Sequence, residues 1–422
     1  MRMGGLPARR RCLSYALACS LSFGAGIAGS NAGLVLQKVP SITAAEAPRY
    51  PENLAHLELG ARIESNPNAD QSSVLLAGDP TSFCSLQEGI TALLISLPEI
   101  ESIDSVAFLN AGMNGSVAIA TASAKLPAGS PQWHDSQARD VSNGLMTSTI
   151  GPIEAKYIRL IFDVRTAGRV GNLGVYSAAP VSDFTMPRTR KIAADETAGD
   201  APKINFADLH ERARIIFVSS GRELRLANNM IDGQAGSAYA FAANDIAPAT
   251  IIDLGRVLPI KRVSTFSNAG PASATFYVFD TLPGGNAANL PETLRVDSQL
   301  LAGLRDVGTV NDDGTGRIAV DFQETSARYV MIAWTPSGST SNFSVAEVAV
   351  LGPATGPTLL ALNRISDGSD HKNVRDFKDI KDFKEIPGEA PEEEQPPAEG
   401  PPPSLPRTPP FVFIPRVIPT SP

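Results

Sequence analysis

Short apolar runs rich in β-branched residues, separated by turn residues, dominate this chain. Ala92-Leu-Leu-Ile-Ser-Leu97 has the length and branching of a buried strand, and Lys156-Tyr-Ile-Arg-Leu-Ile-Phe162 is of the same kind. Val117-Ala-Ile-Ala-Thr121 alternates, and Val170 to Tyr176 forms a further apolar run. Helical periodicity is nearly absent. Short strands with turn signals at regular spacing predict an antiparallel sandwich or barrel.

Eleven residues at the start of the first strand region recur 152 positions downstream. Asn53-Leu-Ala-His-Leu-Glu-Leu-Gly-Ala-Arg-Ile63 matches Asn205-Phe-Ala-Asp-Leu-His-Glu-Arg-Ala-Arg-Ile215, with Asn, Ala, Leu, Ala, Arg and Ile identical. A repeat of this period indicates two copies of one domain, because solenoid units span only tens of residues. Tandem modules suit multivalent binding better than a single catalytic centre.

The strand-like segments follow in the same order in both copies. The corresponding pairs are Ala92–Leu97 with Ala249–Leu254, Ala155–Phe162 with Ala327–Trp334, and Val170–Tyr176 with Val345–Leu351. We therefore expect an all-β protein with two tandem antiparallel jelly-roll sandwiches. The expected parts are a signal peptide (1–32), a tether (33–52), a first sandwich (53–177), a flexible linker (178–204), a second sandwich (205–352) and a disordered acidic, Pro-rich tail (353–422).

The N-terminus resembles an export signal. Arg2, Arg9, Arg10 and Arg11 precede a mostly apolar stretch over residues 12–27, and small residues at 28–32 suit cleavage. A membrane anchor is the alternative, although the stretch is short for a bilayer. A lipidated Cys19 is a further alternative. We expect a secreted, periplasmic or cell-surface protein with no transmembrane segment after cleavage.

Composition supports the β interpretation and excludes some partners. The chain has 422 residues, 43% hydrophobic and 19% charged, with 35 Gly and 34 Pro for turns. A net charge of −8 argues against binding nucleic acid or an anionic membrane. Only Cys84 remains beyond the signal, so no disulfide is expected, and we interpret this thiol as buried rather than nucleophilic.

The C-terminal region has a different character. Val374, Phe377, Ile380, Phe383 and Ile386 recur every third residue between charged residues. This pattern fits a recognition peptide or short amphipathic helix, or a solvated segment of marginal structure. An acidic Pro-rich stretch follows at 392–410, and the tail as a whole could bind a protein partner.

The second copy carries family-like motifs. Asn228-Asn-Met-Ile-Asp-Gly233 resembles an "A-x-D-G" segment, and Ala249-Thr-Ile-Ile-Asp-Leu-Gly255 an "x-I-D-L-G" strand. Arg328-Tyr-Val-Met-Ile-Ala333 and Val345-Ala-Glu-Val-Ala-Val-Leu-Gly352 resemble closing "R-Y-V-R-L" and "I-S-E-V-E-V-Y-G" strands. These motifs resemble the discoidin family, which comprises coagulation factor 5/8 type C domains and related galactose-binding-like carbohydrate-binding modules. The first copy follows through the internal repeat.

The resemblance implies ligand-binding loops at one end of each sandwich and a structural calcium ion. The implied calcium ligands are Asp232, Ser237 and Glu347, together with carbonyl oxygens, a donor set that suits Ca²⁺. Ala77 and Asn172 stand at the corresponding places of the first copy, so at most one such site is expected. The alternative is that Asp232 caps a turn and Glu347 is a surface strand residue.

Catalytic motifs are not found. The four histidines (His56, His134, His210 and His371) have no metal-ligand spacing, and no G-x-S-x-G turn occurs. The acidic pair before Gly314 is typical of a hairpin turn rather than of a glycosidase. Trp133 and Trp334 fit either a core position or a sugar platform, with the core favoured, and Tyr239 leaves the same alternatives open.

The sequence therefore predicts a secreted, non-catalytic protein that binds carbohydrate or another cell-surface ligand, as in cell adhesion, with no cofactor other than calcium. The alternative is a scaffold protein of the cell envelope that binds protein partners, and a glycan-active hydrolase has the least support. Glycan binding predicts an exposed aromatic side chain with polar neighbours in a loop cleft. The scaffold alternative predicts an apolar patch on a sheet face.

Overall fold

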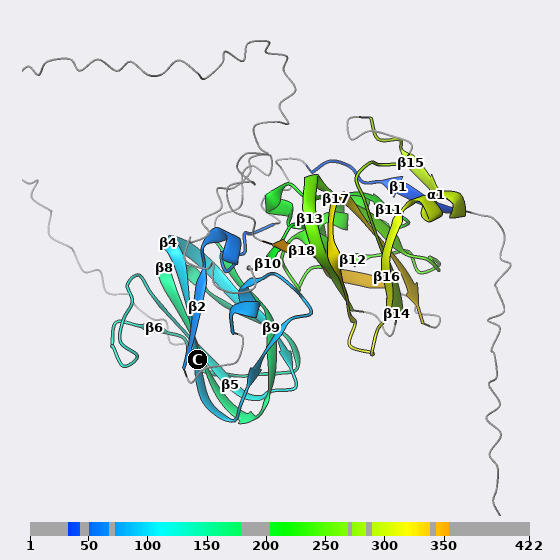
Figure 1. Cartoon of the computed structure of the whole chain (residues 1–422). Helices are drawn as coiled ribbons and strands as arrows, with labels where there is room; N and C mark the ends of the chain where they lie inside the picture. Colours follow the sequence, from blue (N-terminus) through cyan, green and yellow to red (C-terminus); the bar gives the residue numbers. More distant parts are fainter. Residues whose placement is uncertain are drawn as a thin grey trace, which may run out of the picture. The chain divides into compact units, whose positions relative to one another are not determined.

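The computed structural model describes residues 33–42, 50–66, 72–178, 203–268, 272–283, 289–337 and 343–353. These residues form two antiparallel β-sandwiches, as Figure 1 shows, so the expected all-β fold class is confirmed. The signal segment, residues 179–202 of the linker, the period-three segment 374–386 and the rest of the tail from residue 354 lie outside the described residues.

The first sandwich is one hydrogen-bonded network of eight strands. Its strands are β2 (Arg62–Asn66), β3 (Phe83–Leu86), β4 (Gly89–Ala111), β5 (Asn114–Ala122), β6 (His134–Asp135), β7 (Arg139–Asp140), β8 (Gly144–Thr166) and β9 (Gly168–Ser177). Two 3-10 helices, η2 (Leu57–Leu59) and η3 (Ser72–Leu76), lie before β3.

Long strands that bend connect the two layers of this sandwich. The first half of β4 pairs with β2, whereas its second half, from Ile103 to Ala111, pairs with β9. β8 follows β4 along both halves, and the ladder shifts register after Ser96 and Ile103. The apolar residues of the bent strands, such as Ile95 and Phe108, face the core between the layers.

The second sandwich repeats this element order with a network of ten strands. Its strands are β1 (Leu34–Lys38), β10 (Lys203–Asn205), β11 (Arg214–Val218), β12 (Tyr239–Ala240), β13 (Ala249–Ser267), β14 (Ala272–Phe279), β15 (Thr293–Val296), β16 (Arg305–Asn311), β17 (Arg317–Pro336) and β18 (Ser344–Pro353). The helices are η4 (Leu209–Glu211), η5 (Leu224–Ile231) and α1 (Ser298–Gly303). β13 and β17 bend as β4 and β8 do.

Equivalent asparagines tie the start of each sandwich to its last strand. The Asn53 Oδ1 atom accepts hydrogen bonds from the Ala55 and Val175 amides, each at 3.0 Å. The Asn205 Oδ1 atom accepts from the Ala207 and Val350 amides, also at 3.0 Å. The residues identical in the two halves therefore perform the same structural task in each.

The segment expected to be a tether contains a strand of the second sandwich. β1 pairs with β11 on one side and with β15 on the other, and Leu36 is completely buried. The assignment of residues 33–52 to a tether is therefore wrong for this part. Because β1 precedes the first sandwich in sequence, that sandwich is inserted between two segments that build the second. β10 also starts two residues before the expected boundary at 205.

A second apolar cluster explains why this strand is needed. The outer face of β11, β13 and β17 carries Phe217, Ile251 and Met331, and Leu36 of β1 packs against them together with residues of β15. Without this cover, a sheet face of large apolar side chains would meet water, which costs about 25 cal/mol per Å² exposed.

We predict that Leu36→Ala destabilises the second sandwich by roughly 2–5 kcal/mol, because it leaves a cavity in this cluster. The control is Val35→Ala on the same strand, whose side chain is 43% exposed. Thermal unfolding with hydrogen exchange of β11 and β15 measures the effect. Equal effects of the two variants would contradict the placement of β1.

Candidate functional site

Buried polar side chains join the two sandwiches, which belong to the same compact unit of the chain. The Tyr176 hydroxyl of the first donates to the Gly233 carbonyl of the second at 2.9 Å. An ion pair joins Asp79 to Arg262 at 3.0 Å, and His56 Nδ1 lies 3.5 Å from Asp208 Oδ2. We call the region of these contacts the junction.

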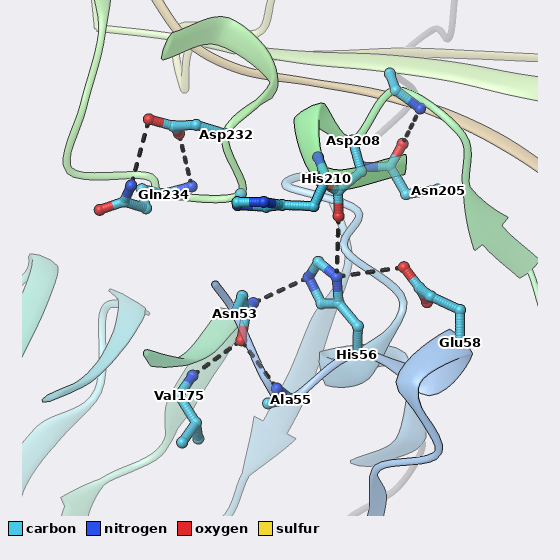
Figure 2. Close-up of polar contacts among 12 residues, drawn as sticks. Asn53, Ala55, His56, Glu58, Val175, Asn205, Asp208, His210, Asp232 and Gln234 are labelled. Atoms are coloured by element: carbon cyan, nitrogen blue, oxygen red, sulfur yellow. Dashed lines mark hydrogen bonds and ion pairs between the residues drawn. The ribbon is translucent and has the colours of Figure 1, made fainter. Parts of the chain in front are cut away.

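The repeated segments themselves meet at the junction, as Figure 2 shows. His56 precedes η2, and Asp208 caps η4 by accepting the His210 amide at 2.7 Å. In the repeat, His56 corresponds to Asp208 and Glu58 corresponds to His210. Each copy thus contributes one imidazole and one carboxylate, and all four side chains are buried.

Three of these side chains have the chemistry of metal ligands. Ligand atoms of His56, Glu58 and Asp208 all lie within 4.8 Å of one another. The His56 Nδ1 atom lies 3.2 Å from Glu58 Oε1, so distances alone would suit a small tetrahedral site. The question is whether Nδ1 offers a lone pair.

The side-chain amide of Asn53 indicates which nitrogen of His56 acts as the acceptor. Its Oδ1 accepts two backbone N–H groups, so its Nδ2 must face His56 Nε2, at 2.9 Å. An amide nitrogen only donates, and Nε2 is therefore the acceptor. A neutral imidazole with an unprotonated Nε2 carries its proton on Nδ1, which lies 3.2 Å from Glu58 Oε1 and 3.5 Å from Asp208 Oδ2. His56 therefore fastens the junction through hydrogen bonding, with Nε2 facing Asn53 and Nδ1 facing the carboxylates of Glu58 and Asp208.

Electrostatics around His56 act against this hydrogen bond. Burial favours the neutral ring, but the carboxylates of Glu58 and Asp208 outweigh it and raise the pKa of His56. The imidazolium would direct an Nε2–H at the Asn53 amide hydrogens, so proton uptake requires Asn53 to move. Burial alone would raise the pKa of Asp208, but the hydrogen bond from His56 and the nearby His210 hold it well below its usual range.

Asp79 provides the second fastening of the junction. Its carboxylate accepts from the Ser264 hydroxyl at 2.8 Å and from Arg262 Nε at 3.0 Å, both from β13 of the second sandwich. Burial would raise the pKa of Asp79, but Arg262 and the Thr81 hydroxyl hold it below its ordinary value. The carboxylate is therefore charged at neutral pH and has both a cation and donors.

The expected calcium ligands come together in the second sandwich. Asp232 follows η5 and Glu347 lies on β18, and each side chain is only 2% exposed. The alternative that Glu347 is a surface residue is therefore wrong. Asp232 does cap a turn, because its carboxylate accepts the Gln234 amide at 3.0 Å.

Oxygen atoms outnumber donors around Ser237. Its hydroxyl lies 2.9 and 2.8 Å from the two carboxylate oxygens of Asp232. It also lies 3.0 Å from the Gln234 carbonyl and 3.4 Å from the Asn229 carbonyl. One hydroxyl proton serves only one of these four acceptors. The Gln234 amide and, at 3.4 Å, Gln234 Nε2 also donate to Asp232, and the carbonyl oxygens of Asn229 and Gln234 complete an oxygen-rich shell.

Glu347 adds a second buried carboxyl group to this shell. Neither of its carboxyl oxygens has a well-formed hydrogen bond, and the Gly233 amide is the backbone donor beside it. Burial, and then the charge of Asp232, raise the pKa of Glu347, and burial likewise raises the pKa of Asp232. Burial and these two carboxylates raise the pKa of Tyr176, so its hydroxyl keeps its proton and donates to Gly233.

The first sandwich lacks both carboxylates at the corresponding place. Gly78 and Gly233 both have left-handed backbones, with φ of 66° and 73°, which supports the alignment of Ala77 with Asp232. Asn172, the counterpart near Glu347, is half-buried and carries an uncharged amide. The oxygen-rich shell is therefore a feature of the second sandwich.

The other candidate side chains belong to the cores and turns. Trp133, Trp334, Tyr239 and Cys84 are all buried, as the core interpretation predicts. Asp312 accepts the Gly316 amide in the expected turn. Every aromatic side chain in the described part of the chain is buried or half-buried. The exposed aromatic platform expected for a glycan site is therefore not found among the described residues.

Two loops of the second sandwich instead present an aliphatic side chain. The Asp245 carboxylate accepts the hydroxyls of Ser219 and Ser220, at 2.6 and 2.5 Å, and the Ala247 amide at 3.0 Å. These bonds join residues 219–222 to residues 241–248. Ile246 on the second loop is 88% exposed, more than any other large hydrophobic side chain described.

Sequence reasoning missed the junction. It treated His56 and His210 as incidental, although the exchange of imidazole and carboxylate between the two copies was readable in the repeat. Complementary residues at equivalent positions of a duplicated segment are the signal that the copies face each other.

No helix among the described residues is long and apolar enough to cross a membrane.

A scan against protein families and a comparison with curated proteins give no match. Among solved structures, a fucolectin from striped bass (Morone saxatilis) serum is similar, with 14% identity over 72% of this chain and 98% of that chain and a TM-score of 0.26. A chitosan-binding module from a Paenibacillus chitosanase/glucanase has 21% identity, 35% and 98% coverage and a TM-score of 0.28.

A GH29 fucosidase from Ruminococcus gnavus has 18% identity and a TM-score of 0.28. This match covers 36% of the present chain and only 27% of the fucosidase chain.

We predict that Arg262→Gln destabilises the chain by about 3 kcal/mol at pH 7, because it leaves Asp79 charged and buried without a cation. The pKa of Asp79 is lowered on folding, so its contribution is present above the unfolded pKa and disappears as pH falls through the folded value. The difference between wild type and variant in thermal unfolding should therefore shrink below about pH 4.

The matched control is Lys125→Gln, which breaks an exposed ion pair with Glu64. This variant should change stability by less than about 1 kcal/mol. An Arg262 variant as stable as the Lys125 variant would show that the junction contact does not form.

Proposed function

We propose that this chain is an exported, non-catalytic binding protein that recognises glycans through loops of its second sandwich. The main support for this proposal is the pair of loops that Asp245 joins by hydrogen bonds. These bonds fix the backbone that presents the exposed Ile246. The exposed polar side chains of Arg222 and Asn244 lie on the same two loops. An apolar contact surrounded by hydrogen-bonding groups suits the C–H face and hydroxyls of a sugar.

The resemblance of the second copy to discoidin motifs supports this proposal. The resemblance implies binding through loops at one end of the sandwich, and residues 219–222 and 241–248 are loops of the second sandwich. The same element order in both halves, and the matching roles of Asn53 and Asn205, support a duplicated module as its origin. The signal-like N-terminus supports export, which a fractionation of the natural host would test.

We further propose a structural calcium ion in the second sandwich. The oxygen shell offers the carboxylates of Asp232 and Glu347, the Ser237 hydroxyl and the carbonyls of Asn229 and Gln234. Ca²⁺ prefers six to eight oxygen ligands, including carboxylates and carbonyls, so this donor set fits it. The ion would neutralise two buried charges and fix the loop, without taking part in any reaction.

We predict opposite effects of Glu347→Gln with and without calcium. In chelator, the variant should melt higher than wild type, because it removes a buried charge that has no partner, worth about 1–4 kcal/mol. In excess calcium, wild type should gain about 2.7 kcal/mol at a concentration one hundred times Kd, whereas the variant gains little. Glu324→Gln, on the exposed surface of β17, is the control. Unchanged melting of wild type on chelation would exclude the ion.

We predict that the full chain binds members of a glycan array and that Ile246→Ser abolishes this binding. The full chain is required because β1 completes the second sandwich. The control is Ile90→Ser, which changes a 68% exposed isoleucine of the first sandwich and should leave binding unchanged. Binding of no glycan by wild type would overturn the proposal and favour a scaffold protein.

A further inference from the structure

The loop that carries the oxygen shell also contacts the first sandwich. Gly233 lies between Asp232 and Gln234, and its carbonyl oxygen accepts from the Tyr176 hydroxyl at 2.9 Å. The Asp232 carboxylate and the Gln234 carbonyl are directed to Ser237. Neighbouring residues of one short segment therefore contribute to two sites: Asp232 and Gln234 to the proposed calcium site, and Gly233 to the junction.

Close packing reinforces this contact on both sides. A methyl group at Gly233 would lie 3.8 Å from His56 Cε1, and one at Gly236 would lie 3.1 Å from Leu145 Cδ2. Both neighbours belong to the first sandwich. Residues 232–237 therefore have Tyr176, His56 and Leu145 of the first sandwich as close neighbours, and a movement of the loop toward that sandwich would displace them.

Tyr176 is well placed to transmit such a shift. It lies near the end of β9 and forms a β-bridge with Asn53, the residue that orients His56. A movement of the Gly233 carbonyl changes the Tyr176 hydrogen bond, and through Asn53 it reaches the His56–Asp208 contact. Backbone hydrogen bonds on both sides of this bridge, from the Leu54 amide to the Val175 carbonyl and from the Ser177 amide to the Glu52 carbonyl, hold the two segments together.

We propose that the calcium site of the second sandwich and the junction are coupled through residues 232–237, with Tyr176 as the positioning residue. This inference rests on the calcium ion proposed above. With the ion bound, the loop is fixed and the junction is closed. Without it, the buried carboxylates repel each other, the loop relaxes and the junction loosens. Coupling is reciprocal, so a closed junction also strengthens calcium binding by the same factor.

The test compares wild type with Tyr176→Phe in the full chain, using hydrogen exchange and calorimetric calcium titration. In wild type, chelation should increase exchange both in residues 232–237 and in residues 53–58 and 172–178 of the first sandwich. In Tyr176→Phe, calcium should still protect residues 232–237 but no longer protect the first sandwich. Its calcium affinity should fall about 2- to 10-fold, the effect of one hydrogen bond.

The control is Tyr157→Phe, which changes a half-buried tyrosine in an outer apolar cluster of the first sandwich and should behave as wild type. Calcium binding to wild type without any change in residues 53–58 and 172–178 would overturn the coupling and leave the calcium site intact. Absence of calcium binding to wild type would overturn both. The two failures are therefore distinguishable.

Discussion

A buried carboxylate needs donors or a cation, and this requirement organises the contact between the two sandwiches. Asp79 meets it with Arg262 and three hydroxyls, and Asp208 meets it with His56 and a backbone amide. Each solution takes at least one partner from the opposite sandwich. The two domains must therefore be in contact for these charges to be stabilised, whereas an apolar contact would tolerate separation at a smaller cost.

Element order and core positions were largely readable from the sequence. Alternation and branching located the strands, and burial of Trp334 followed from its place at the end of an apolar strand. β1 was missed because Leu34 to Lys38 is short and its partners lie about 180 or more residues away, so no local pattern marks it. Local periodicity reports which face a residue uses, not which distant strand it joins.

For the polar sites, too, the sequence indicated local groupings of residues but not their contacts with distant parts of the chain. Motif resemblance placed Asp232, Ser237 and Glu347 together, but not the contact of that loop with Tyr176, because a family motif describes one domain at a time. At His56 the residue types alone would suggest a metal site, because the imidazole lies between two carboxylates. The orientation of its ring is fixed by Asn53, a residue retained in both copies for a backbone role.

The position of β1 has a consequence for how the chain reaches its folded state. During synthesis or export the residues from Leu34 to Lys38 emerge first, yet the edges that receive them belong to segments made much later. The intervening domain has all its own strands by Ser177 and can collapse alone. The early strand must stay unpaired in the meantime, so long-range closure should be the slow step of folding. A chaperone that binds residues 34–38 would therefore have its largest effect before that step.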